Sequence, residues 1–343
     1  MRAIGYWALS VALAAGCRPV TEPARSLDEF QSRLERLRID GRVHSLSVVI
    51  AREQTIAWSR TLGGGAAIAD TTVFHLASLT KPLAATVILQ LVDEGSVSLD
   101  DPVSMYGIAM PNAGSVLVRH LLSHTSAGVP GSSFAYDGNR FSLLDSVIRR
   151  STGQSFANAL QERIIVPLGL RHTAPSPHSP AFAASGLDRD AYLANLANGY
   201  RWSGTGFLPT AYETVFNSAA GLTASARDYA AFSMAMDRDA FLAPATRELA
   251  YTAARGASGA ALPYGLGWFV SDYKGVRVIW HYGLWTASSS LVIKVPSQGL
   301  TFVLLANSDG LSAPYPLGAG RLDTSPWARE FLETFAIARL PLP

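Results

Sequence analysis

The chain has 343 residues, 48% of them hydrophobic and 16% charged, which is typical of a globular protein and excludes a disordered one. The formal net charge of +2 is nearly balanced, and lysine and arginine form no cluster, so nucleic acid is not expected as a partner. The length allows one large domain or two modest ones.

The N-terminus differs in kind from the rest of the chain. A positive start at Arg2 is followed by an apolar run over residues 4–15 and then by Gly16 and Cys17. The run is too short to span a bilayer comfortably, and it predicts an export signal over residues 1–16. Cys17 is the only cysteine, so it forms no internal disulfide.

The position of Cys17 resembles a bacterial lipoprotein signal, which is cut before a cysteine that then carries lipid. The resemblance implies a protein of the bacterial cell envelope that faces the periplasm and is anchored at Cys17, with Arg18 favouring the outer membrane. Ala14 departs from this pattern, because leucine usually stands three residues before the cysteine. An ordinary secretory signal with an incidental cysteine is the alternative. Residues 17–26 are expected to form a tether.

A single domain is expected over residues 27–343. Apolar spacing predicts helices at 27–37, 83–92, 116–124, 141–152, 155–165, 226–236 and 327–338. Apolar and β-branched runs predict strands at 45–52, 55–61, 264–271, 276–281, 288–295 and 300–307. Residues 172–215 are rich in Pro, Ser, Gly and Asn and predict a long irregular connection. Strands at both ends predict an α+β fold with one sheet built from both termini and a helical subdomain at approximately 83–215.

Ser78 and Lys81 are the first candidates for catalytic residues. Lys81 is one of only three lysines, and it follows Ser78 by three residues at the head of a predicted helix. Residues i and i+3 share a helix face, so the hydroxyl and the amine would point into one small volume. A serine becomes a nucleophile when a base takes its proton, and a lysine of lowered pKa is such a base. Alternatively, Ser78 merely caps the helix.

Several pieces of the sequence, in order, resemble the serine β-lactamase and penicillin-binding superfamily, and more narrowly class C β-lactamases, DD-peptidases and related esterases. The pieces are residues 74–103, 118–128, 134–156, 221–232, 264–269 and 280–310. The resemblance implies a β-lactamase/transpeptidase-like fold, an antiparallel sheet flanked by helices with a mostly helical insertion. It also implies a serine hydrolase that works through an acyl-enzyme without a cofactor.

The resemblance assigns roles to three side chains. Ser78 would be the acylated nucleophile, and Lys81 the amine beside it. Tyr136 matches the motif tyrosine, which moves protons to the leaving group and activates water. A tyrosine base needs a nearby positive charge to lower its pKa, and Lys81 is the expected source. Alternatively, Tyr136 is only a packed aromatic.

The third motif of the family, Lys/His-x-Gly, is matched by His281 and Gly283. The backbone N–H groups of Ser78 and Leu284 would form the oxyanion hole. Histidine in place of lysine is more typical of DD-peptidases, D-amino-acid peptidases and esterases, because a histidine is largely neutral at pH 7. His281 is otherwise a histidine at the end of a strand.

The second motif, Tyr-x-Asn, departs from the family pattern. It reads Tyr136-Asp137-Gly138 here, and Asn139 stands one place late. In class C enzymes this asparagine binds the substrate amide and helps to hold the lysine. Its displacement puts tight β-lactam binding in doubt, unless Asn139 or Asp137 reaches into the site.

The expected function is hydrolysis of a small-molecule or peptide substrate: a β-lactam, a D-amino-acid peptide or a small ester. The alternative is a non-hydrolytic penicillin-binding sensor or envelope scaffold. His120 and His124 are four residues apart, but no third ligand accompanies them, so no metal site is expected.

Overall fold

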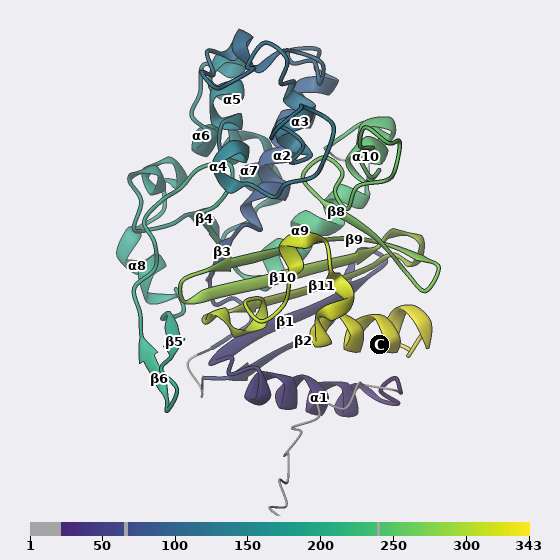
Figure 1. The fold of residues 1–343 in the computed structure, drawn as a ribbon. Coiled ribbons are helices and arrows are strands. Elements are labelled where there is room, and N and C mark those ends of the chain that lie inside the picture. Colours follow the sequence, from purple (N-terminus) through teal and green to yellow (C-terminus); the bar gives the residue numbers. More distant parts are fainter. Residues whose placement is uncertain (1–21, 65–67, 239–240) are drawn as a thin grey trace, which may run out of the picture.

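The computed structural model describes residues 22–64, 68–238 and 241–343, so the predicted signal and the first half of the tether, with Cys17, lie outside the described residues. A central antiparallel sheet has six strands in the order β2-β1-β11-β10-β9-β8 (Figure 1). The strands are β1 (Ser45–Arg52), β2 (Thr55–Gly63), β8 (Phe269–Tyr273), β9 (Val276–Trp285), β10 (Ser288–Val295) and β11 (Leu300–Ala306). Because β1 pairs with β11, the prediction of one sheet built from both ends of the chain is confirmed.

The central strands are buried on both faces because their side chains alternate between two apolar cores. On β10, Leu291 and Ile293 belong to one core and Val292 to the other. Burying an aliphatic side chain of this size stabilises the fold by about 1.5–3 kcal/mol. Helices α1 (Leu27–Asp40) and α11 (Pro326–Phe331) cover the core that contains Leu291 and Ile293. Helices α2 (Thr80–Asp93) and α9 (Ala226–Asp237) cover the core that contains Val292.

The start of α1 shows how local sequence sets an element. Ser26 caps the helix by accepting a hydrogen bond from the Glu29 backbone N–H at 3.1 Å. Phe30 and Leu34, one turn apart, are fully buried against the sheet side of the helix. The spaced apolar residues from which this helix was predicted therefore form its buried face.

Five of the helices between the two groups of strands gather beyond one end of the sheet, at the top of Figure 1. They are α3 (Val118–Leu122), α4 (Gly138–Phe141), α5 (Leu144–Thr152), α6 (Phe156–Leu160) and α7 (Val166–Leu168). A second sheet, in the order β3-β7-β4, joins this region to the main sheet; its strands are β3 (Phe74–Ala77), β4 (Thr173–Pro175) and β7 (Leu222–Ala224). This small sheet was not predicted, because each of its strands has only three or four residues.

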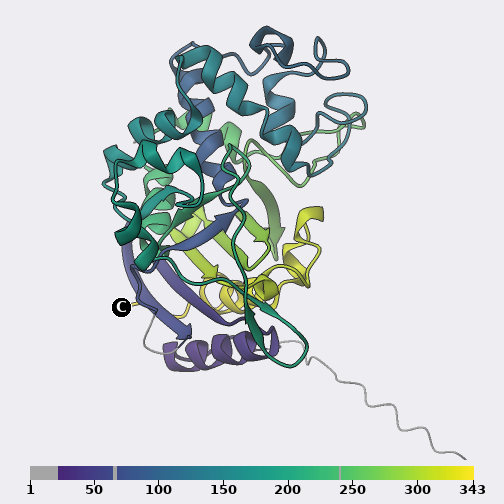
Figure 2. The ribbon, with the colours of Figure 1, turned by 90° about the vertical axis from the view of Figure 1, so that its left-hand side faces the viewer.

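The connection over residues 172–215 is more structured than expected. Besides β4 it contains α8 (Arg189–Ala194) and a hairpin of β5 (Tyr200–Trp202) and β6 (Phe207–Pro209). The hairpin extends past the sheet beside α1 (Figure 2), where the Arg42 guanidinium lies 5.1 Å from the centre of the Trp202 ring.

Three further differences concern single elements. The strand expected at 264–271 is formed only from Phe269 onward, with Tyr264 in an isolated bridge. The expected helix at 141–152 begins only at Leu144 as α5, with the separate short helix α4 before it, and α10 (Pro244–Ala250) was not expected. No helix among the described residues is long and apolar enough to cross a membrane.

Candidate active site

Ser78 lies in the turn between β3 and α2, where the second sheet meets the main one. Throughout residues 72–89 it is the one side chain that is not buried. Ala77, directly before it, has a φ of 49°, a left-handed conformation that costs a non-glycine residue about 1–3 kcal/mol. The Thr80 hydroxyl stabilises this turn by donating to the Ala77 carbonyl at 2.8 Å and accepting from the Leu222 N–H at 3.1 Å.

The structure brings Lys81 against Ser78, as the spacing predicts. Lys81 Nζ lies 2.8 Å from Ser78 Oγ and donates to the Ala219 carbonyl at 2.9 Å. Burial lowers the pKa of Lys81 to about 7, although the Asp137 carboxylate nearby raises it. A lysine of this pKa is largely neutral just above pH 7, and only a neutral amine can take the proton of Ser78.

Tyr136 forms the wall of the site next to these two residues. Its ring centre lies 5.0 Å from Lys81 Nζ and 5.7 Å from the ring of Tyr282. Its hydroxyl is buried and makes no hydrogen bond of good geometry among the described residues. Burial raises the pKa of Tyr136 well above its usual value, with a smaller opposing effect of the Ser78 hydroxyl. The phenol is therefore protonated, and the expectation that Lys81 lowers its pKa is not met.

His281 lies beside Tyr136 but turns both ring nitrogens inward. Nδ1 is 2.7 Å from the Tyr282 carbonyl, and Nε2 is 2.9 Å from the Tyr264 hydroxyl. A carbonyl only accepts, so Nδ1 carries the hydrogen and Nε2 accepts from Tyr264. Burial, with the charge of Lys81, lowers the pKa of His281 well below its usual value, and the ring is neutral. In this arrangement His281 has no free donor for a substrate carboxylate.

Gly283 lets β9 approach the nucleophile. A Cβ atom at this position would lie 2.2 Å from the Leu76 carbonyl oxygen and 3.2 Å from the Ser78 backbone nitrogen. This close approach brings the segment containing Leu284, whose side chain is exposed, next to Ser78. The arrangement suits the predicted oxyanion hole, in which both N–H donors must face the same oxygen.

The Asn139 side chain forms no hydrogen bond with Lys81, whose amine bonds only Ser78 and Ala219 among the described residues. The Asn139 side chain is exposed, while its backbone carbonyl accepts a hydrogen bond from Ser142. Gly138 occupies the motif position instead, and a Cβ there would lie 3.8 Å from Lys81 Nζ. Asp137 caps α4 by accepting from the Arg140 N–H at 3.0 Å. The position of the motif asparagine therefore faces Lys81 without a side chain.

Two residues near the site were not predicted as parts of it. The Ala219 carbonyl holds Lys81, but a backbone acceptor leaves no signal in the sequence. His124 accepts from the Asp137 N–H at 3.1 Å, and its ring lies 4.4 Å from that of Tyr136. The Ala219 carbonyl therefore holds the Lys81 amine, and His124 holds the backbone next to Tyr136. Among the described residues, no three His, Cys, Asp or Glu side chains are grouped to hold a metal ion.

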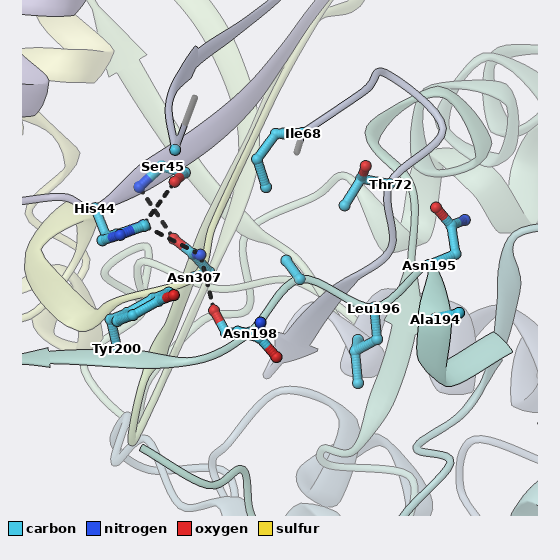
Figure 3. A pocket seen from close by; sticks show the side chains of 12 residues that line it. His44, Ser45, Ile68, Thr72, Ala194, Asn195, Leu196, Asn198, Tyr200 and Asn307 are labelled. Atoms are coloured by element: carbon cyan, nitrogen blue, oxygen red, sulfur yellow. Dashed lines mark hydrogen bonds between the residues drawn. The ribbon is translucent and has the colours of Figure 1, made fainter. Parts of the chain in front are cut away.

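A cavity of about 180 Å³ is lined by residues at the start of β1, around Thr72 and in the segment 194–200 (Figure 3). His44 and Tyr200 stack at one side of it with ring centres 3.7 Å apart, and Asn307 bridges Ser45 and the Asn198 carbonyl. Thr72 faces it from the segment before β3. The candidate catalytic residues do not line this cavity.

The antiparallel sheet with its helices and the Ser78–Lys81 pair have the arrangement that the sequence resemblance implies. The family model described as Beta-lactamase matches residues 30–322. The chain therefore belongs to the Beta-lactamase family, as the sequence motifs indicate, within the superfamily of serine β-lactamases and transpeptidases.

Curated relatives carry several names. The chain is 26% identical over 285 residues to a penicillin-binding protein of Bacillus subtilis (strain 168), covering 69% of this chain and 61% of that protein. It is 26% identical over 314 residues to Penicillin-binding protein 4 of Amycolatopsis lactamdurans, covering 78% of each. It is 28% identical over 195 residues to Esterase EstB of Burkholderia gladioli, covering 41% of this chain and 48% of the esterase.

Solved structures confirm the fold. The penicillin-binding protein homologue from Pyrococcus abyssi superimposes with a TM-score of 0.74 at 20% identity, covering 92% of this chain and 80% of that one. A D-stereospecific amidohydrolase from Streptomyces sp. superimposes with a TM-score of 0.69 at 22% identity, covering 82% and 94%. The predicted α+β fold of the β-lactamase type is correct.

Proposed function

We propose that the chain hydrolyses amide or ester bonds through an acyl-enzyme on Ser78. The observation that carries this proposal is the 2.8 Å between Lys81 Nζ and Ser78 Oγ, at a depth where burial lowers the pKa of Lys81 to about 7. Neutral Lys81 takes the hydroxyl proton while Oγ attacks the carbonyl carbon. The backbone N–H groups of Ser78 and Leu284 donate to the oxyanion that forms.

Tyr136 completes the cycle as a proton donor. When the tetrahedral intermediate collapses, an amine leaving group needs a proton, and the phenol of Tyr136 is kept protonated by burial. The Lys81 ammonium then returns a proton to Tyr136. In the second half of the reaction, water attacks the acyl carbon, its proton follows the reverse route, and Ser78 is regenerated.

The site favours an ester or amide that carries no carboxylate beside the reacting bond. β-Lactams and cell-wall peptides ending in D-amino acids both carry such a carboxylate. His281 has no donor left to bind it, and Gly138 supplies no amide to hold the acyl group. A relative is named an esterase, and a structural neighbour is a D-amino acid amidase from Ochrobactrum anthropi. We therefore place small esters and neutral amides ahead of β-lactams.

Mass spectrometry over time tests this proposal, with protein that starts at residue 18. We expect a short p-nitrophenyl ester to give a transient acyl adduct on Ser78, with turnover, and Ser78→Ala to give neither. Thr80→Ser, two residues along, keeps a hydroxyl in the same turn and serves as the control that should still acylate. Full activity of Ser78→Ala would contradict the proposal.

The same experiment separates the alternatives. A penicillin adduct that persists for hours without turnover of any ester would favour the non-hydrolytic penicillin-binding sensor. A penicillin adduct that forms and decays would move the substrate to β-lactams. No adduct with either compound would favour the envelope scaffold.

We also propose that the protein is exported and anchored by lipid at Cys17. The support is the apolar run followed by Gly16 and Cys17. Detergent extraction of the full chain from a bacterial membrane fraction tests this. Cys17→Ser should move the protein to the soluble fraction of the periplasm, and an unchanged distribution would contradict the anchor.

A further inference from the structure

The amine of Lys81 depends for its position on one backbone carbonyl. Besides Ser78, the only acceptor that Lys81 Nζ reaches among the described residues is the Ala219 oxygen, at 2.9 Å. Gly138 stands where a side-chain amide would otherwise hold the amine. The position of the loop over residues 217–220, which carries the Ala219 carbonyl, therefore determines the direction of the Lys81 amine.

This loop, which we call the lysine-anchoring loop, is fastened mainly at Ser218. The Ser218 N–H donates to Asp145 Oδ1 at 2.8 Å, and its hydroxyl donates more weakly to the Phe141 carbonyl at 3.3 Å. Inside the loop, Asn217 Oδ1 accepts from the Ala219 N–H at 2.9 Å. The Asp145 contact is the charge-assisted bond that ties the loop to another element, and such bonds are about twice as strong as neutral ones.

Asp145 lies in the first turn of α5 and lines a cavity. The cavity, of about 450 Å³, lies between α5, α6 and the segment Pro180–Ser185, and it is also lined by Arg149, Phe156 and Phe216. Burial raises the pKa of the Asp145 carboxyl, while its bonds with Ser218 and the charge of Arg149 lower it. Removing a carboxylate from water costs free energy unless hydrogen bonds compensate for the lost solvation, and the bond from the Ser218 N–H does so here.

A simpler role would be to stabilise the start of α5, where a negative charge is favourable by about 0.3–1 kcal/mol. That role needs only a carboxylate near the helix end and does not require a bond to a distant loop. Asp145 also bonds a residue 73 positions away, next to the one that holds Lys81. The helix-end role does not explain this contact.

We propose that Asp145 is a positioning residue for catalysis: its carboxylate holds the lysine-anchoring loop at the depth where the Ala219 carbonyl aims the Lys81 amine at Ser78. The proposal rests on the function proposed above for Ser78 and Lys81. The chain of contacts runs from Asp145 through the Ser218 N–H and the Ala219 carbonyl to Lys81 Nζ.

The test compares Asp145→Ala with Asp145→Asn in otherwise unchanged full-length protein. The amide oxygen of Asn accepts the same bond from Ser218, and Ala does not. Asp228→Ala is the matched control, because Asp228 accepts from the His172 backbone N–H at the same 2.8 Å but fastens a segment that does not touch Lys81. If Asp145→Ala does not fold, Asp145→Ser replaces it, since its shorter side chain does not span the distance to Ser218.

The first readout is the pre-steady-state rate of Ser78 acylation by a p-nitrophenyl ester from pH 5 to 9. We expect Asp145→Ala to acylate about tenfold slower with little change in KM, since misplacing a reacting group costs rate rather than binding. Asp145→Asn and Asp228→Ala should acylate within about twofold of the parent. Equal rates for Asp145→Ala and the parent, or the same loss in Asp228→Ala or Asp145→Asn, would overturn the proposal.

The second readout needs no activity. The chain has three lysines, Lys81, Lys274 and Lys294, so a ¹³Cε-lysine spectrum is assigned with single substitutions. A carbonyl acceptor favours the ammonium form, so its displacement in Asp145→Ala should lower the pKa of Lys81 by about one unit. An unchanged Lys81 titration would overturn the proposal. Absence of acylation in the parent protein, with this shift present, would overturn only the proposed function.

Discussion

Gly283 and Ser78 lie so close together that a side chain on Gly283 would start 3.2 Å from the Ser78 backbone nitrogen. Two sheets meet at this contact, because Gly283 belongs to the main sheet and Ser78 follows the last residue of β3. The absence of one methyl group therefore determines whether the two proposed oxyanion donors face the same point.

Gly283→Ala should accordingly remove most of the activity. The added Cβ would lie 2.2 Å from the Leu76 carbonyl oxygen, so β9 or β3 must move. We expect acylation to fall about 100-fold or more, as for loss of an oxyanion donor, and the free energy of unfolding to fall by about 1–3 kcal/mol. Single-turnover kinetics and urea denaturation measure the two effects.

Gly114→Ala is the control for that substitution. Gly114 lies in an exposed turn, and a Cβ there meets nothing within 4 Å. It should change neither quantity measurably. Normal acylation by Gly283→Ala would show that the approach of β9 does not set the oxyanion hole.

Lys81 couples activity to pH. Acylation needs neutral Lys81, whose pKa burial lowers to about 7, so the acylation rate should rise with pH and reach half its plateau near pH 7. Lys81→Arg stays protonated and should be inactive throughout this range. A stopped-flow profile with a p-nitrophenyl ester measures this, and a rate independent of pH between 5 and 9 would argue against Lys81 as the base.

The same pKa shift has a stability consequence. Because the folded state loses the Lys81 proton near pH 7 and the unfolded state near 10.5, the unfolded state binds more protons between these values. Stability therefore rises with pH across this window, and the cost of burying Lys81 is largest at pH 7 and below. Lys81→Met should raise the free energy of unfolding by about 1–3 kcal/mol at pH 7, and the gain should shrink toward pH 10. Denaturation at both pH values checks this.

Gly138→Asn should restore a side-chain amide beside Lys81. A Cβ at this position lies 3.8 Å from Lys81 Nζ, an ordinary contact distance, so the new side chain has room to start toward the amine. We expect kcat/KM for a chromogenic β-lactam to rise about tenfold relative to that for a p-nitrophenyl ester, equivalent to one good hydrogen bond. Asn139→Ala removes only an exposed side chain and should leave both values unchanged.

The residues that carry the proposed chemistry were predictable, and their supports were not. Ser78 and Lys81 follow from a spacing that one helix turn translates directly into proximity. The proposed supports, Asp145 and the Ala219 carbonyl, act through the backbone of the lysine-anchoring loop. This loop is far along the chain from Ser78 and Lys81, and no local sequence pattern predicts such contacts. The exposure of Asn139 could not be predicted from the sequence either, because it depends on where α4 begins, and the Asp137 side chain sets that position by capping the helix.

The main sheet was predictable because its central strands are buried on both faces, between two apolar cores. All residues of β10 and β11 are buried, and the mainly apolar runs in these two segments indicate strands that are buried on both faces. The short strands β3 and β7 have no such run, and they form because Phe74 and Ala224 meet across the chain. Tertiary contacts, rather than local propensity, produce them.

Tyr136→Phe should separate the two proton transfers of the proposed mechanism. The phenol is protonated because burial raises its pKa, so its role is to protonate the leaving group rather than to activate Ser78. A p-nitrophenolate leaves without a proton, whereas an aniline does not. We expect Tyr136→Phe to acylate with a p-nitrophenyl ester within about fivefold of the parent, but with the matching p-nitroanilide about 100-fold slower.

Tyr282→Phe is the control for this prediction, since the Tyr282 ring lies 5.7 Å from that of Tyr136 and the substitution removes a neighbouring phenol hydroxyl while it keeps the ring packing. It should affect ester and anilide equally. An equal loss for both substrates in Tyr136→Phe would mean that Tyr136 helps to take the Ser78 proton. In that case Lys81 would serve to orient the serine, and the half-maximal rate near pH 7 would have to arise from another group.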